Sequence, residues 1–159
     1  MSSFIDNSNF YIKNTNADLT NYRFDGKKIS LTNQEWKSIL TKDDFCILRE
    51  KATERGFSGS LYHEESAGLY CCKGCGLPLF ESETKYNSGS GWPSFFKRIQ
   101  HQGEPSRITE TADNSLGMKR VEICCARCDS HLGHLFEDGP KPTGQRYCVN
   151  SASLSFQKE

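Results

Sequence analysis

Hydrophobic and polar residues follow two different patterns along this chain, and the pattern changes near residue 68. The earlier part has two stretches with helical spacing. The first opens with the capping-box pattern Thr32-x-x-Glu35 before the apolar Trp36 and Ile39, which predicts a short helix ending near residue 40. The second starts at Thr41 and spaces its apolar residues at helical intervals, which predicts a helix continuing toward residue 54.

After residue 68 short extended runs alternate with Gly, Pro, Asn and Asp. Strands are expected over residues 69–72, 77–80, 117–124, 131–136, 146–150 and 153–156. This order predicts a mainly β, antiparallel domain behind a small helical lead. Residues 1–28 are rich in Asn and Ser, so they are expected to form an irregular arm outside a single domain at 31–157.

Composition narrows the classes of partner. A formal net charge of 0 with scattered basic residues predicts neither a nucleic acid nor a membrane partner. The N-terminus lacks a basic region followed by an apolar stretch, and no apolar run reaches membrane-spanning length. The 8 cysteines are therefore expected to be metal ligands or reactive thiols in a reducing, cytoplasmic compartment.

Cysteine spacing indicates a metal site. Two Cys-x-x-Cys pairs, or knuckles, are formed by Cys72, Cys75, Cys125 and Cys128. Together they supply the thiolates of a closed tetrahedral zinc site, although the same ligands accept iron. A haem attachment would need His directly after a pair, and a redox dithiol would need only one pair. Cys71 and Cys124, which precede the pairs, are expected to be spectators.

One cysteine stands apart from the others, in the expected strand Arg146-Tyr-Cys148-Val-Asn150. Alternate side chains of a strand share a face, so Arg146 and Asn150 would flank the Cys148 sulfur. The cation would favour the nucleophilic thiolate, and the amide could hold a polar substrate group. The alternative is that Cys148 is a small buried hydrophobic residue, as most free cysteines are.

Two histidines, His131 and His134, follow the second cysteine pair. One interpretation is that a histidine replaces a cysteine on the metal, and another is that both are ordinary surface residues. The functional interpretation makes them proton donors or orienting groups near Cys148, since imidazole titrates near neutral pH.

Two loops carry further candidate residues. Trp92 lies in the glycine-rich, proline-stopped loop 88–95, where its ring either packs in the core or forms one wall of an apolar ligand pocket. Asp138 lies in a turn, as a capping carboxylate or a hydrogen-bond partner of a histidine.

Several segments together resemble the methionine sulfoxide reductase B family. They are Tyr70-x-Cys-x-x-Cys-Gly76, Ser88-Gly-Ser-Gly-Trp-Pro-Ser-Phe95, Cys125-x-x-Cys-Asp-Ser-His-Leu-Gly-His-x-Phe-x-Asp-Gly-Pro140 and Arg146-Tyr-Cys-Val-Asn-Ser-Ala-Ser-Leu154. They occur in the family's order between about residues 31 and 156, and residues 50–59 resemble its lead-in, with Gly56 where proline is more usual. Enzymes of this class reverse methionine sulfoxide formation.

The resemblance implies a fold and an activity. The fold would be two antiparallel β-sheets with short N-terminal helices, clamped by a structural zinc ion on four cysteines. Cys148 would attack the sulfur of the R epimer of methionine sulfoxide, protein-bound or free, giving a sulfenic acid and methionine. The sulfoxide oxygen cannot leave as an oxide ion, so a donor must protonate it during the attack.

The resemblance also implies roles for neighbouring residues. His131, His134 and Asn150 occupy the family's positions for the proton-donating network. Asp138 and Arg146 would support that network, and Trp92 would pack against the substrate methyl group.

Regeneration of the thiol is expected to differ from the family's usual route. Many relatives carry a resolving cysteine two residues before the loop tryptophan, where this chain has Ser90. The cysteine best able to move is Cys46, in the polar lead before the β domain, so it is expected to resolve the sulfenic acid in preference to an external thiol. Thioredoxin, the family's customary reductant, or a small thiol would then restore the enzyme.

A different class of function stays open at this point. The same zinc-clamped β scaffold can serve as a non-catalytic domain for ligand or protein recognition. Such a module would have no need of Cys148 between Arg146 and Asn150, so the isolated cysteine favours the enzyme.

Overall fold

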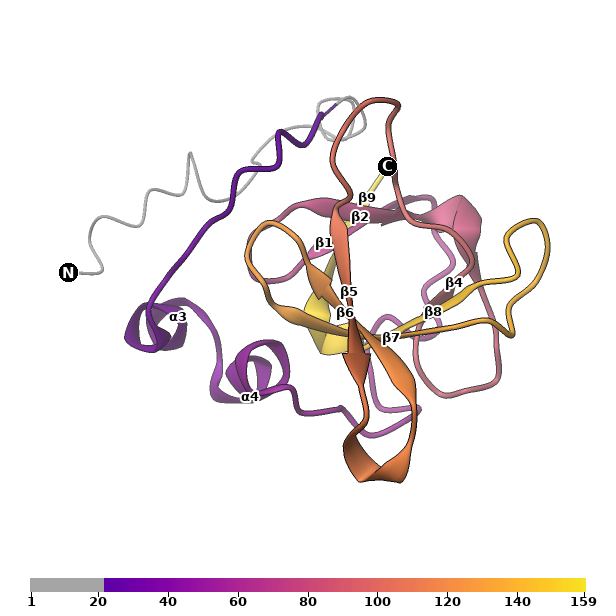
Figure 1. Ribbon diagram of the computed structural model, residues 1–159. Coiled ribbons are helices and arrows are strands. Elements are labelled where there is room, and N and C mark those ends of the chain that lie inside the picture. The colour runs from indigo at the N-terminus through magenta and orange to yellow at the C-terminus, as the bar shows by residue number, and fades with distance from the viewer. Residues whose placement is uncertain (1–21) are drawn as a thin grey trace.

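In the computed structural model, which describes residues 22–159, two short α-helices lie to one side of a pair of β-sheets (Figure 1). Helix α3 (Asn33–Ile39) has the predicted capping box. The Glu35 N–H donates to Thr32 Oγ1 at 3.2 Å, and the Thr32 N–H donates to Glu35 Oε1 at 2.8 Å. The reciprocal bonds satisfy two backbone N–H groups at the helix start and fix where it begins.

Helix α4 (Lys42–Glu50) begins after Thr41 as expected but ends before residue 54. Lys51 takes the left-handed conformation with φ 62°, and the Ala52 N–H closes on the Cys46 carbonyl at 3.0 Å. This C-terminal cap stops the helix and turns the chain toward the sheets. Within residues 22–159 no helix is long and apolar enough to cross a membrane.

Every pair of neighbouring strands is antiparallel, so the predicted fold class is confirmed. The smaller sheet has the order β2 (Pro78–Glu81), β1 (Gly68–Cys72), β9 (Leu154–Lys158). The larger sheet has the order β3 (Lys85–Tyr86), β4 (Ser94–Phe95), β8 (Arg146–Val149), β7 (His131–Phe136), β6 (Arg120–Cys125), β5 (Ile108–Asp113).

Strand β7 has the predicted bounds, but others differ from the sequence prediction. Strand β6 begins at Arg120 instead of residue 117, because Leu116 and Gly117 take positive φ of 57° and 69° in a turn. Strands β3, β4 and β5 were not predicted. The first two have only two residues each, and β5 is mostly exposed, so none shows a run of alternating apolar residues.

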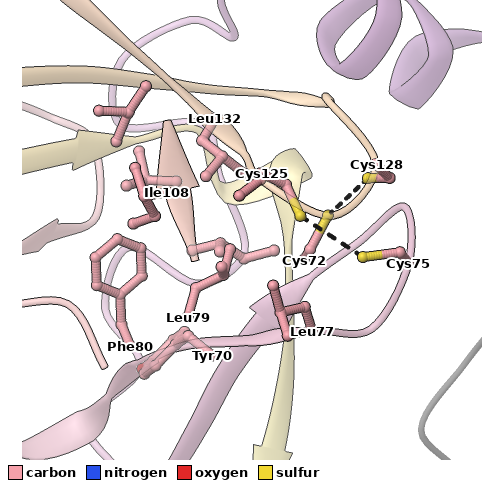
Figure 2. Packing of buried hydrophobic residues seen from close by; sticks show 14 of the residues in the cluster. Tyr70, Cys72, Cys75, Leu77, Leu79, Phe80, Ile108, Cys125, Cys128 and Leu132 are labelled. Carbon is pink, nitrogen blue, oxygen red and sulfur yellow. Dashed lines mark hydrogen bonds between the residues drawn. The ribbon is translucent and has the colours of Figure 1, made fainter. Parts of the chain in front are cut away.

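An aromatic cluster joins the two sheets. Phe80 of β2 stacks on Phe95 of β4 with ring centroids 4.3 Å apart, and Tyr147 of β8 meets the Phe80 edge at 5.5 Å. Figure 2 shows the knuckle cysteines at one end of this buried cluster, beyond Leu77. The core therefore continues without a break from the aromatic rings to the four sulfur atoms.

The segment before α3 lies against the domain where it is described. Phe24 is buried in the core, and its N–H donates to Glu104 Oε1 at 3.1 Å. The first 21 residues of the expected arm lie outside the described residues, and residues 22–28 have no regular secondary structure. The boundary between arm and domain therefore stays a prediction.

A buried ion pair anchors this segment. Arg107, which has no exposed surface, donates to Glu104 at 2.7 and 3.1 Å, to the Pro78 carbonyl at 2.8 Å and to the Tyr22 carbonyl at 2.8 Å. Burial alone raises the pKa of Glu104, but bonds from Arg107 and the Phe24 N–H lower it to about 2. The ion pair therefore joins the segment before α3, strand β2 and the loop before β5.

Glu104→Gln is expected to lower the free energy of unfolding by about 3–5 kcal/mol, because it leaves the Arg107 cation buried without a counter-charge. Since the folded pKa is depressed, the pair's contribution is complete above the ordinary carboxyl pKa of about 4.5 and is lost as pH falls toward about 2. Urea unfolding as a function of pH tests both statements. Glu110→Gln, which breaks the partly exposed pair with Arg98, is the control and should cost about 1 kcal/mol or less. Equal losses in the two variants would contradict the prediction.

Candidate active site and thiolate cluster

The register of the larger sheet brings the candidate nucleophile beside a histidine. Cys148 of β8 pairs with Ser94 of β4 on one side and with His134 of β7 on the other. Beyond them the same row continues to Tyr86 of β3 and Glu122 of β6. Directly paired residues project on one face of a sheet, so these side chains form one polar row with the thiol at its centre.

The sequence of β8 explains why the thiol points out of the core. Arg146 and Cys148 are half-buried on one face, as predicted, while Tyr147 and Val149 are buried on the other. Gly133 of β7 lies against this strand, where an added Cβ would stand 1.9 Å from the Cys148 carbonyl oxygen. Only glycine allows the two backbones to approach this closely.

A small cavity of about 80 Å³ opens over the thiol. It is lined by Thr53, Trp92, Gly133, His134, Phe136, Cys148 and Asn150. Four predicted residues, Trp92, His134, Cys148 and Asn150, thus meet in one place, whereas His131, Asp138 and Arg146 do not line the cavity. A larger cavity of about 390 Å³ between residues 62–66 and 82–87 contains no cysteine, so size alone does not mark the reactive site.

Opposing effects act on the nucleophile. Burial raises the pKa of the Cys148 thiol above its ordinary value, while the Arg146 cation and the Ser90 hydroxyl, 4.0 Å from the sulfur, lower it. The expected influence of Arg146 is present in direction, but burial outweighs it. The neutral thiol is therefore favoured overall, and formation of the thiolate depends on these neighbours.

The two histidines lie on one face although they are three residues apart. A bulge between β6 and β7 pairs Cys124 with His131 but Glu122 with His134, so β7 has one extra residue between the histidines. Their ring centroids lie 5.8 Å apart. In a regular strand they would point to opposite faces, and the second would miss the site.

Each imidazole is held by a carboxylate that the sequence analysis did not identify. His134 Nε2 lies 2.8 Å from Asp113 Oδ2, and His131 Nδ1 lies 2.8 Å from Glu122 Oε2. Hydrogen bonds from Ser115 and His134 hold the pKa of Asp113 below its usual range. The Asp113 side chain is therefore a carboxylate, which accepts a hydrogen bond from His134. The sequence signal for Glu122 was a single charged residue inside the apolar run of β6.

His131 is only 3% exposed and does not line the cavity. Burial lowers its pKa, although Glu122 opposes this effect, so its neutral form is favoured, with the proton on Nδ1. Glu122 in turn accepts a bond from Lys51 Nζ at 3.1 Å. This arrangement fixes the tautomer and the ring orientation of His131.

Asn150 uses its amide to bind backbone groups. Its Nδ2 donates to the Leu132 carbonyl at 3.1 Å, and its Oδ1 accepts the Glu54 N–H at 3.0 Å. The Glu54 carbonyl accepts from Trp92 Nε1 at 3.0 Å, and the Glu54 carboxylate accepts the N–H groups of residues 151 and 152 at 2.9 Å. Asn150 and Glu54 together hold the tryptophan wall against the end of β8.

Arg146 and Asp138 form a two-pronged ion pair with distances of 2.8 and 3.1 Å. The Arg146 guanidinium also lies over the Phe136 ring, 4.2 Å from its centroid. Since Phe136 lines the cavity, this contact fixes both the cation beside the thiol and one apolar wall.

The four cysteines of the two pairs come together in a second site. Cys72 Sγ lies 3.6 Å from Cys128 Sγ, and Cys75 Sγ lies 3.6 Å from Cys125 Sγ, with the sulfur atoms pointing toward one another (Figure 2). All are buried and lie within 4.8 Å of one another. Tetrahedral zinc with Zn–S bonds of about 2.3 Å requires sulfur atoms about 3.8 Å apart, whereas a disulfide needs about 2 Å. The geometry therefore fits a bound metal ion.

The two knuckles have matching turns. The Gly76 N–H donates to the Cys72 carbonyl and the Asp129 N–H to the Cys125 carbonyl, each at 2.8 Å. Gly76 and Asp129 both take positive φ, 85° and 64°. Such a turn points both cysteines of a knuckle inward. Cys71 and Cys124 lie outside the cluster.

Comparison with known proteins gives a consistent family. The SelR domain model matches residues 40–158. Peptide methionine sulfoxide reductase MsrB of Methanosarcina mazei is 54% identical over 132 residues, which are 83% of this chain and 91% of that protein. The proteins of the same name from Leptospira interrogans and Hahella chejuensis are 49% and 53% identical, over 83% and 81% of this chain and 98% and 90% of their own.

Proposed function

The chain belongs to the SelR domain family, and on that premise we propose that it reduces methionine sulfoxide in peptides to methionine, with Cys148 as the nucleophile. The observation that carries the proposal is the cavity in which Cys148 meets Trp92, Phe136 and His134. Two aromatic walls suit a thioether methyl group, while the thiol and the imidazole suit the two reacting atoms of a sulfoxide.

In the proposed step the Cys148 thiolate attacks the sulfoxide sulfur while His134 supplies a proton to the oxygen. Asp113 binds His134 Nε2 and so fixes the ring, which leaves the second ring nitrogen to supply the proton. The oxygen then passes to Cys148 as a sulfenic acid, and methionine is released. The substrate sulfur gains two electrons and the Cys148 sulfur loses two, so the step balances without a further oxidant.

The remaining predicted residues act through these groups. Asp138 holds Arg146 beside the thiolate, and Asn150 holds the backbone around the cavity. His131, bound to Glu122, lies 5.8 Å from the His134 ring and supports its position.

We expect single-turnover reduction of the R epimer of a methionine sulfoxide peptide and little reduction of the S epimer. The Trp92 wall accepts the methyl group, and exchange of methyl and oxygen would leave the oxygen without a donor, at a cost of roughly 1–3 kcal/mol, or about 5- to 150-fold in rate. Reduced protein is mixed with each resolved epimer without added reductant, and methionine is counted. Trp92→Ala should slow the R reaction in a folded protein. Comparable rates on both epimers would contradict the assignment of the pocket.

Regeneration is proposed to use Cys46 and then thioredoxin or a small thiol. Cys46 is half-buried in α4, and its carbonyl accepts the N–H of Ala52, whose neighbour Thr53 lines the cavity. Opening of the last turn of α4 is the movement that would carry the thiol toward Cys148. In the single-turnover experiment, loss of two thiols with a linked 46–148 peptide supports this route. Loss of one thiol, with a dimedone adduct on Cys148, contradicts it.

The metal is proposed to be one structural zinc ion, held by Cys72, Cys75, Cys125 and Cys128. When bound, the ion cross-links two distant segments and has no position for substrate. Cysteines kept reduced for such a site support a reducing compartment, and we propose the cytoplasm.

A further inference from the structure

Three serine hydroxyls gather beside the nucleophile in the loop that carries Trp92. Ser88 Oγ lies 2.8 Å from Ser90 Oγ and 2.7 Å from Ser94 Oγ, and Ser90 Oγ lies 4.0 Å from Cys148 Sγ. Ser94 is fully buried and pairs directly with Cys148 across β4 and β8. The thiol is therefore in contact with a connected chain of hydroxyl groups.

The hydrogen bonds around Ser90 determine what it can offer to the sulfur. A serine hydroxyl has two acceptor sites and one donor proton. Ser90 Oγ accepts from Ser88 Oγ at 2.8 Å and from the Trp92 N–H at 3.3 Å, which fills both acceptor sites. Its proton can point to the Trp92 carbonyl at 3.3 Å or to Cys148 Sγ at 4.0 Å.

The first of these acceptors is already shared. Ser94 Oγ lies 3.1 Å from the Trp92 carbonyl and 2.7 Å from Ser88 Oγ, and its single proton can be donated to either, so the carbonyl has a second donor within reach when the Ser90 proton turns away. A neutral Cys148 thiol is a weak acceptor, whereas a thiolate or a sulfenic oxygen is a strong one. The preferred direction of the Ser90 proton therefore changes with the state of Cys148.

We propose that Ser90 is a catalytic hydrogen-bond donor, which stabilises the Cys148 thiolate and then holds the oxygen of the sulfenic acid formed there. This inference rests on the proposed function and deepens it. The Ser90 hydroxyl cannot form a disulfide, so it preserves the sulfenic acid until a thiol reaches it. Ser88 keeps Ser90 in the donor orientation by filling its acceptor site.

Other charged or titratable groups face the same sulfur and must be held constant. Arg146 of β8, His134 of β7 and Tyr86 of β3 face Cys148 from the elements packed around it, with Asp138 behind Arg146. Ser90 contributes one of the influences that lower the pKa of Cys148, after the Arg146 charge. Substitution of Ser90 changes this contribution and leaves the ion pair in place.

The experiment measures the rate of iodoacetamide alkylation at Cys148 against pH, resolved by peptide mass spectrometry, with Cys46 as internal reference. Ser90→Ala should move the curve to higher pH by about one unit, which makes alkylation at pH 7 about tenfold slower. Ser90→Thr keeps the hydroxyl and should follow the wild-type curve. The control Ser38→Ala removes an exposed hydroxyl bonded to the Glu35 carbonyl and should change nothing.

A second measurement follows the sulfenic acid after one equivalent of sulfoxide, by dimedone trapping at increasing delays, with Cys46→Ser present in every variant so that the proposed resolving thiol does not compete. The half-life of the sulfenic acid should fall severalfold in Ser90→Ala and stay at the wild-type value in Ser90→Thr. Identical alkylation curves for wild type and Ser90→Ala, or the same shift in the Ala and Thr variants, would overturn the proposal. Alkylation needs no sulfoxide, so a shifted curve in a protein that reduces no sulfoxide would overturn only the proposed function.

Discussion

Replacing Cys148 by serine is expected to abolish sulfoxide reduction, by a factor on the order of 10⁴ or more, while metal content and melting temperature stay nearly unchanged. A serine hydroxyl is a weak nucleophile without an activating base, and its oxygen cannot take up the sulfoxide oxygen as sulfur does. The side chain is half-buried on the open face of β8, so exchange of sulfur for oxygen disturbs little of the core. Single-turnover assays with metal analysis and thermal unfolding test both statements.

The matched control for this prediction is Cys71→Ala. Cys71 is buried in β1 outside both sites, and burial raises its pKa to about 12, so it is an inert thiol. Its variant should reduce sulfoxide at the wild-type single-turnover rate. Turnover that persists in Cys148→Ser would show that Cys148 is not the nucleophile. Metal loss in that variant would show that Cys148 is a metal ligand.

The elements that the sequence predicted well are those that bury one face. Strand β7 and both helix starts depend on apolar spacing and capping residues, which are local features. Strand β5 has a single buried residue, Ile108, and is held only by pairing with β6, which no local pattern reveals. The end of α4 depends on the left-handed conformation of Lys51. Glycine usually marks such a cap in a sequence, and lysine does not.

The candidate site was predictable where the spacing of residues along the sequence determines where their side chains point. The two cysteine pairs and the alternation of Arg146 and Cys148 follow from turn and strand geometry. The shared face of the two histidines depended on a bulge, and Asp113 reached His134 from a strand that had not been predicted. Contacts between residues on different strands therefore could not be predicted from local sequence patterns, although the residues themselves are present in the sequence.

Replacing Cys72 or Cys128 by serine is expected to release the metal and remove cooperative unfolding. Each substitution removes one ligand from a buried cluster in which sulfur atoms lie 3.6 Å apart, and the remaining three cysteines no longer supply a complete tetrahedral site. Structural zinc contributes on the order of 10 kcal/mol of apparent binding free energy, comparable to the total stability of about 5–15 kcal/mol expected for a domain. Metal stoichiometry by mass spectrometry and thermal unfolding are the measurements.

The position of the cluster explains why the loss should spread through the protein. Cys72 belongs to β1 of the smaller sheet and Cys125 to β6 of the larger, so the ion would hold the two sheets together. Cys124→Ser changes the residue next to a ligand, on the half-buried face of β6, and should retain one metal ion per chain. A chelator that removes zinc from the wild type should reproduce the melting behaviour of Cys128→Ser. If Cys128→Ser instead keeps its metal and its melting temperature, the four sulfur atoms do not form the metal site, and the sheets are held by the aromatic core alone.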